Sequence, residues 1–250
     1  MGTDPSALGA LGLMMRVFTD FDGPIMDVSE RYYQVYQYCL SQASEPDQLI
    51  RVLPKAEFWR LKRAQVPERQ IGQISGLHDD QARYFAQLRR ETVHSRDYLH
   101  HDRILPGAIA ALETMQTMQY DLVVVTMRRQ QSLYPVIEQY DLGRFFGPDA
   151  RYCLPDDYVK DQDVIEKTRL MAKAIAQLPP ASTMWMIGDT EADIAAARAH
   201  DLPVVAVLSG IRDRDRLAAY GPDLIVNNLT EAVNVIQRAT PCPPSTPFWG

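Results

Sequence analysis

The stretch Val17-Phe18-Thr19-Asp20-Phe21-Asp22-Gly23 decides the fold of this chain. A short apolar run ends abruptly in two carboxylates one residue apart, and the glycine that follows can turn the chain sharply. Continuous apolar runs suit strands that are buried on both faces, as in a parallel sheet. Runs of the same kind follow at residues 122–126, 184–189, 204–209 and 224–226.

Helical patterns lie between these runs. Apolar residues recur at spacings of three and four over residues 108–115, 133–140 and 170–178. Strands that alternate with helices of about a dozen residues are typical of right-handed βαβ crossovers. The sequence therefore predicts an α/β fold whose core is a Rossmann-like parallel sheet.

The connection between the first two runs is much too long for one crossover. About a hundred residues separate Asp20 from Leu122, and the segments 31–40, 55–64 and 79–93 are rich in helix formers and aromatic residues. We therefore expect a small all-α cap domain to be inserted into this connection. The expected domains are a core of residues 1–24 and 105–240, a cap of residues 25–104, and a proline-rich tail of residues 241–250.

Composition argues against several classes of partner. The 250 residues contain 26 Lys and Arg against 32 Asp and Glu, so the net charge of −6 does not favour nucleic acid binding. No run approaches the ~18 apolar residues of a membrane-spanning helix. Cys39, Cys153 and Cys242 lie far apart and form no metal-binding cluster, which favours reduced thiols in a cytoplasmic protein. We expect a monomer or homodimer with no nucleic acid or membrane partner.

The carboxyl ends of the predicted strands carry the candidate site, because ligands of open parallel sheets bind there. The first run ends in Asp20 and Asp22, the second ends in Thr126, and the third leads into Asp189 and Asp193. So many carboxylates at one sheet edge repel one another unless a cation is bound. Oxygen ligands with room for water and a phosphate are those that Mg²⁺ prefers.

Four separated motifs resemble those of the haloacid dehalogenase superfamily. They are DxDG at 20–23, Thr126, a lysine, and GDxxxD at 188–193, in that order along the chain. The resemblance covers residues 16–237, and it is to the phosphoglycolate phosphatase and β-phosphoglucomutase branch, whose helical cap lies where this insertion falls.

The resemblance implies a role for each acidic residue. Asp20 would be the nucleophile that forms an aspartyl phosphate, and Asp22 would be the general acid and base. Asp20, the backbone carbonyl of Asp22, and Asp189 would hold Mg²⁺. For Asp193 three roles stay open: reaching the metal through water, orienting the lysine, or favouring a helix start by its charge. Glu191 is expected to be a solvated residue of the same first turn.

The resemblance also implies a phosphate-binding set. Thr126 would bind a phosphoryl oxygen together with the amides of Met127 and Arg128 at the start of the next helix, and Gly23 belongs to the same set. Asp163 and Glu166 resemble a capping box, which would place Lys167 in the first helical turn, facing the carboxylates. We therefore choose Lys167 as the catalytic lysine and keep Lys160 as the alternative; Lys173 lies too far along the helix.

These residues predict a Mg²⁺-dependent phosphatase that hydrolyses a small phosphorylated metabolite through an aspartyl phosphate. One alternative is a sugar phosphomutase similar to β-phosphoglucomutase, and an alternative of another class is a non-catalytic binding module on the same fold. In the cap, Phe58, Trp59 and Leu61 are expected to pack inside. At least two of the neighbouring cations Arg60, Lys62 and Arg63 are expected to stay in water.

Overall fold

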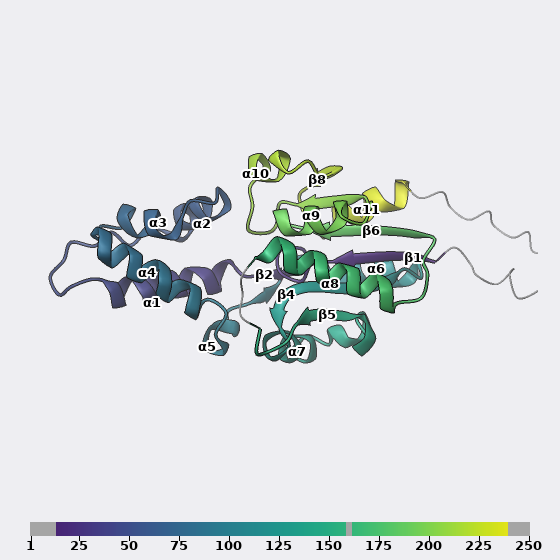
Figure 1. The fold of residues 1–250 in the computed structure, drawn as a ribbon, viewed down its shortest axis with the longest axis horizontal. Helices are drawn as coiled ribbons and strands as arrows, with labels where there is room; N and C mark the ends of the chain where they lie inside the picture. Colours follow the sequence, from purple (N-terminus) through teal and green to yellow (C-terminus); the bar gives the residue numbers. More distant parts are fainter. Residues whose placement is uncertain (1–13, 159–161, 240–250) are drawn as a thin grey trace, which may run out of the picture.

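The structure, a computed structural model, describes residues 14–158 and 162–239 (Figure 1). Its strands are β1 Met15–Thr19, β2 Met26–Asp27, β3 Arg103–Ile104, β4 Asp121–Arg129, β5 Arg151–Leu154, β6 Thr183–Gly188, β7 Val204–Val207 and β8 Leu224–Val226. The helices of the first half are α1 Ser29–Ala43, α2 Lys55–Arg63, α3 Glu68–Ile74, α4 Asp79–Thr92, α5 Arg96–Leu99 and α6 Ala108–Thr117. Those of the second half are α7 Gln130–Gln139, α8 Asp163–Gln177, α9 Glu191–Arg198, α10 Arg214–Ala219 and α11 Leu229–Ala239, with short turns η2 Leu142–Arg144 and η3 Pro148–Ala150.

Six of the described strands form one sheet in the order β5-β4-β1-β6-β7-β8, and each neighbouring pair is parallel. The predicted α/β parallel core is therefore confirmed. β1 lies in the middle, where Thr19 is in register with Val124 of β4 and with Ile187 of β6. This order places the loop after β1 between the carboxyl ends of β4 and β6.

Helices cover both faces of the sheet. Val17, Val124 and Val205 pack in one hydrophobic cluster with α6, α7 and α11. The neighbouring strand residues Phe18 and Val123 point to the other face, where they pack with α8 and α9. Because both faces are covered, the strands are apolar without alternation, which is why their runs stand out in the sequence.

The helices α1 to α5 lie between β2 and β3 in the chain and project from one end of the sheet (Figure 1). They have a hydrophobic cluster of their own, in which Tyr36, Phe58 and Phe85 are completely buried. The chain leaves the core and returns to it through the antiparallel pair β2 and β3, where Met26 is in register with Ile104. The two segments that join the inserted helices to the core therefore lie side by side.

Two local predictions are wrong. β4 does not end at Thr126 but continues to Arg129, which is in register with Leu154 of β5. The pairing with β5 is irregular between Val125 and Arg129, and the buried Arg128 side chain in this stretch is held by Asp22 and Asp102. Asp163 is the first residue of α8 rather than its cap, since the N-cap position is Gln162 and makes no side-chain cap hydrogen bond.

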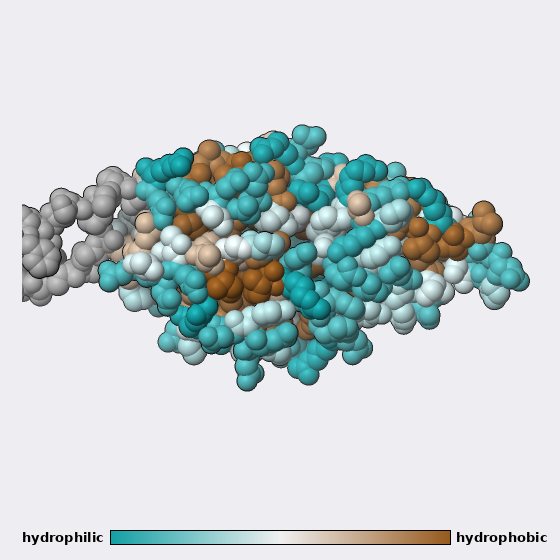
Figure 2. All heavy atoms as spheres, turned by 180° about the vertical axis from the view of Figure 1, so that it is seen from behind, coloured by the Kyte–Doolittle hydropathy of each residue, from teal (hydrophilic) through white to brown (hydrophobic). Residues whose placement is uncertain are grey.

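On the reverse face, hydrophilic side chains cover much of the surface, and hydrophobic side chains gather in patches over the core and on the inserted helices (Figure 2). Among the described residues no helix is long and apolar enough to cross a membrane. Cys39 is buried and Cys153 partly buried, both as free thiols. The predicted tail at 241–250, Cys242 and Lys160 lie outside the described residues.

Candidate active site

Three carboxylates meet at the carboxyl end of the central strands. The amide of Asp20 donates to the Ile187 carbonyl at 2.8 Å, which joins the loop after β1 to the end of β6. Asp20, Asp189 and Asp193 are all buried, and each offers an oxygen within 4.8 Å of the others. The structure therefore brings together three of the four residues that the sequence assigned to a metal.

Lys167 joins these carboxylates from α8. Its side chain is 1% exposed, and Nζ lies 2.6 Å from Asp20 Oδ2 and 2.5 Å from Asp193 Oδ1. Burial acts to lower the pKa of Lys167, but the carboxylates of Asp193 and Asp20 outweigh it and raise that pKa. Lys173 is exposed further along α8. Lys167 is therefore a permanent cation in contact with the candidate nucleophile.

Asp189 is clamped by backbone groups. Ile211 donates its amide to Asp189 Oδ2 at 2.6 Å, and a Cβ atom at Gly210 would lie 1.9 Å from the same oxygen. A Cβ at Gly23, where φ is +92°, would also overlap the Asp189 carboxylate. The glycines after β1 and β7 thus form a cradle for Asp189 that a side chain at either position would fill.

The charges of this cluster fit a divalent cation. Three carboxylates face a single ammonium group, Lys167, within the described cluster. Burial raises the pKa of Asp20 to about 7, although Lys167 opposes this, and burial together with Asp20 and Asp193 raises the pKa of Asp189 well above its usual range. Ionising these buried carboxylates is costly unless a positive charge lies beside them. Carboxylate oxygens are also the ligands that Mg²⁺ prefers, so the cluster suits this ion.

These shifts predict how stability depends on pH in the metal-free protein. Because the pKa of Asp20 and that of Asp189 are raised, the folded chain binds more protons than the unfolded chain between about pH 4 and 7. The stability that these protons supply is lost as pH rises toward 7. In EDTA, the Tm of the wild type should fall more steeply between about pH 5 and 7 than that of Asp20→Asn, which lacks one of the two groups.

Added Mg²⁺ should raise the Tm of the wild type more at about pH 7.5 than at about pH 5.5, since fewer protons then compete for the ligands. Thermal unfolding followed by circular dichroism measures both effects. Equal slopes for the two proteins in EDTA would contradict the prediction.

Asp193 takes two of the three roles that the sequence left open. Its Oδ1 binds Lys167, and its Oδ2 accepts hydrogen bonds from the amides of Asp189 and Thr190 at 3.1 and 3.0 Å. It also accepts one from Thr190 Oγ1 at 2.7 Å, and together these contacts form a capping box at the start of α9. Asp193 thus orients the lysine and begins the helix, while metal binding by it stays a prediction.

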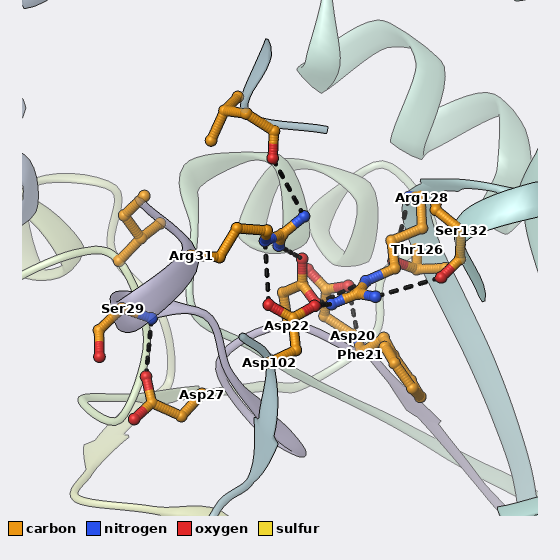
Figure 3. A network of polar contacts seen from close by, with 12 residues as sticks. Asp20, Phe21, Asp22, Asp27, Ser29, Arg31, Asp102, Thr126, Arg128 and Ser132 are labelled. Carbon is orange, nitrogen blue, oxygen red and sulfur yellow. Dashed lines mark hydrogen bonds and ion pairs between the residues drawn. The ribbon is translucent and has the colours of Figure 1, made fainter. Parts of the chain in front are cut away.

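The carboxylate of Asp22 is held by two arginines (Figure 3). Its Oδ1 lies 2.6 Å from Arg128 Nη2 and its Oδ2 lies 3.2 Å from Arg31 Nη2. Burial alone would raise the pKa of Asp22, but Arg128 and Arg31 outweigh it and hold that pKa below its usual value. In this arrangement Asp22 is a carboxylate, the form that serves as a general base.

Sequence reasoning missed the charged residues around Asp22. Arg31 belongs to α1 of the insertion, Arg128 to the end of β4, and Asp102 to the segment just before β3. Asp102 binds both arginines and is 1% exposed. Lone charged residues so far apart in the sequence carry no signal that they meet, and Arg128 was singled out only for its backbone amide.

The predicted phosphate-binding groups are partly engaged with the protein itself. Thr126 is buried, and its hydroxyl accepts a hydrogen bond from the amide of Arg128 at 3.3 Å. The amide of Gly23 donates to the Met26 carbonyl at 2.9 Å, so Gly23 shapes the turn and is not a free donor. Since α7 begins at Gln130, Met127 and Arg128 are strand residues, and their predicted place at a helix start is wrong.

The end of α2 docks on the core, which corrects the expectation for its cations. Arg63 Nη2 donates to the carbonyls of Leu208 and Arg212 at 2.9 and 3.1 Å, and Lys62 is paired with Glu68. Arg60 alone of these three cations is exposed. Two of them are therefore drawn out of water, Arg63 by the carbonyls of the loop after β7 and Lys62 by Glu68 of α3.

Glu191 is not a freely solvated residue either. It forms two hydrogen bonds of 2.8 Å with Arg212, and Gln65 of the insertion donates to it at 3.1 Å. This cluster joins the end of α2, the loop after β7 and the start of α9. The inserted helices are thus held over the side of the sheet where the carboxylates meet.

Comparisons with known proteins agree with this geometry. The family model described as haloacid dehalogenase-like hydrolase matches residues 17–198, more than half of the chain, and a second, HAD-hydrolase-like, model matches residues 167–232. A phosphoglycolate phosphatase of Pseudomonas fluorescens is 22% identical over 157 residues, covering 63% of this chain and 55% of that protein.

A phosphoglycolate phosphatase of Synechococcus elongatus is 24% identical over 231 residues, covering 90% of this chain and 100% of that protein. The match spans about half the length of the first of these relatives. The crystal structure of a predicted phosphatase from Clostridium acetobutylicum superposes with a TM-score of 0.66 at 20% identity, covering 91% of this chain and 100% of that one. At this identity the likeness shows the fold.

Proposed function

Because the chain belongs to the haloacid dehalogenase-like hydrolase family, we propose that it is a Mg²⁺-dependent phosphatase that hydrolyses a small phosphate monoester through an aspartyl phosphate. The observation that carries the proposal is the contact of Lys167 with both Asp20 and Asp193, beside Asp189, at the carboxyl ends of β1 and β6. The names of the relatives, phosphoglycolate phosphatases, support a small phosphorylated acid as one candidate substrate.

The nucleophile is Asp20. Its Oδ1 accepts a hydrogen bond from the amide of Phe21 at 2.6 Å and its Oδ2 binds Lys167, so the carboxylate is held in one orientation. One of its oxygens attacks phosphorus, the bond from phosphorus to the leaving oxygen breaks, and an acyl phosphate forms on Asp20. Lys167 and the Thr126 hydroxyl stabilise the charge on the phosphoryl oxygens.

Asp22 is the general acid and base. Asp22 is a carboxylate in the free protein; it takes up the proton of the phosphate monoanion as the substrate binds and passes it to the leaving oxygen. The resulting carboxylate takes a proton from the water that then hydrolyses the acyl phosphate. Phosphate is released, Asp22 gives this proton up to solvent, and both aspartates are carboxylates again. Asp20, Asp189 and the backbone carbonyl of Asp22 would hold the Mg²⁺, whose charge offsets the repulsion between nucleophile and phosphate. Asp193 would support these ligands by holding Lys167 next to Asp20.

Residues 25–104 act as a cap domain in this proposal. The pairing of β2 with β3 and the docking of Arg63 on the carbonyls of Leu208 and Arg212 support this division. A docked cap excludes water from the acyl phosphate and surrounds the leaving group, and its opening admits small substrates. The specificity of the enzyme would then lie in the insertion.

A panel of phosphate esters, which includes 2-phosphoglycolate, sugar phosphates and an aryl phosphate, tests the proposal. Phosphate release is expected with Mg²⁺, and EDTA should lower the rate by roughly 10² or more because two ligand carboxylates then repel the substrate. Excess Mg²⁺ should restore it. The same assay with a bisphosphate activator detects an isomerised sugar phosphate, which would assign the chain to phosphomutases instead. No turnover of any ester would favour a binding module.

A further inference from the structure

Asp22 belongs to a closed ring of four charges, Asp22-Arg31-Asp102-Arg128, of which the last three are buried while the Asp22 side chain is 26% exposed (Figure 3). Asp102 Oδ1 lies 3.0 Å from Arg31 Nε, and Asp102 Oδ2 lies 2.5 Å from Arg128 Nη2. The same two guanidinium groups bind the two oxygens of Asp22. Each arginine therefore bridges the two aspartates, and the ring carries no net charge.

The ring joins three parts of the molecule. Arg31 comes from the first turn of α1 in the insertion, Arg128 and Asp22 come from the core, and Asp102 lies directly before strand β3. Arg31 is also fixed by the Val93 carbonyl at 3.3 Å, and Arg128 by the Ser132 carbonyl at 3.2 Å. Their side chains are 1% and 2% exposed, so little room is left for other orientations.

The side chain of Asp102 pairs with Arg31 and Arg128, and within the described part of the chain it forms no hydrogen bond or ion pair with Asp20, Asp189 or Lys167. Asp102 is the second carboxylate partner of both arginines, whose first is Asp22. Without it, two buried guanidinium groups would share one carboxylate, Asp22, and an uncompensated buried charge is costly enough to move side chains or admit water. The position of the Asp22 carboxylate would then no longer be determined.

We infer that Asp102 is a positioning residue, which holds Arg31 and Arg128 in the orientation from which they place the Asp22 carboxylate for proton transfer. This inference rests on the proposed role of Asp22 as general acid and base. It also makes the placement of Asp22 depend on the insertion, because Arg31 reaches the ring only where α1 lies against the core.

The test is Asp102→Asn, which keeps the shape of the side chain and removes its charge. We expect kcat to fall by roughly 10- to 100-fold, because a displacement of about 1 Å of a reacting group has costs of this size. KM should change by less than about threefold, since Asp102 does not touch the substrate. In combination with Arg31→Lys, the loss should be smaller than the product of the two single losses, because both changes act through one ring.

Asp121→Asn is the matched control. Asp121 is the carboxylate partner of another buried arginine, Arg16, at 2.6 Å, but at the opposite ends of β4 and β1. It should lower the Tm while kcat stays within about twofold of the wild type. A folded Asp102→Asn enzyme with wild-type kcat would overturn the inference. If Asp102→Asn does not fold, Asp102→Glu, which keeps the charge and displaces it by one methylene, replaces it with the same expectation.

A second readout does not need turnover. The amides of Gly23 and Met26 are protected by the carbonyls of Met26 and Phe21, in the loop that carries Asp22. Hydrogen exchange of these amides should be about tenfold or more faster in Asp102→Asn than in Asp121→Asn. If the wild type hydrolyses no ester, faster exchange upholds the positioning role while the phosphatase proposal fails, and unchanged exchange overturns the positioning role as well.

Discussion

Replacement of Asp20 by Asn is expected to lower phosphate release by at least roughly 10⁴-fold, the loss typical of removing a catalytic nucleophile. The amide keeps the size of the carboxylate but cannot form the acyl phosphate, and it provides no anionic oxygen for the metal. The measurement is steady-state phosphate release with saturating Mg²⁺, on whichever ester of the panel the wild type turns over best.

Loss of fold does not explain such a result. Burial raises the pKa of Asp20 to about 7, which means that its ionised form is costly in the metal-free protein. The Tm of metal-free Asp20→Asn should therefore equal or exceed that of the wild type at about pH 8. Asp27→Asn is the matched control, because Asp27 lies a few residues away and accepts a hydrogen bond from the amide of Ser29 at the start of α1, away from the cluster. A variant at position 20 that retains a tenth of wild-type turnover would remove Asp20 from the mechanism.

Replacement of Lys167 by Ala should cost roughly 10² or more in kcat, comparable to the loss of one preorganised donor at a developing charge. It should also destabilise the protein by about 3 kcal/mol at neutral pH in the absence of metal, because Asp20 and Asp193 lose their buried partner. Thermal unfolding and phosphate release on the same preparation separate the two effects, and added Mg²⁺ should recover part of the stability but not the rate.

Lys173→Ala is the control for this change, since Lys173 lies on the same helix with an exposed side chain. Its rate and Tm should match those of the wild type. If Lys167→Ala retains nearly normal turnover, the catalytic role passes to Lys160, and Lys160→Ala should then be the inactive variant.

Much of the candidate site follows from strand-end reasoning. Apolar runs buried on both faces predict parallel strands, and parallel strands place Asp20 and Asp189 at one edge. The order of the strands in the structure brings Asp20 next to Asp189, because β1 and β6 are neighbours in the sheet. The choice of Lys167 also followed from a local rule, the expected start of α8, even though Asp163 begins the helix without capping it.

The errors share a physical cause. Thr126 was expected at a strand end, and at least two of Arg60, Lys62 and Arg63 in water. For Thr126 and Arg63 the outcome was decided by a partner distant in the sequence: Leu154 extends β4, and the carbonyls of Leu208 and Arg212 hold Arg63. Lys62 pairs with Glu68 of the next helix. The secondary-structure preference of a short segment carries no information about such partners. They come into contact only when the chain folds.

The sequence by itself determined the parallel α/β core, the place of the insertion and the residues at the carboxyl ends of the strands, because these depend on periodicity and on the direction of the chain. The tertiary structure alone decided the environment of Asp22. Arg31, Asp102 and Arg128 come from an inserted helix, the segment before β3 and a strand. They meet because buried charges are stable when each finds an opposite partner, and such partners are chosen by packing in three dimensions and not by position along the chain.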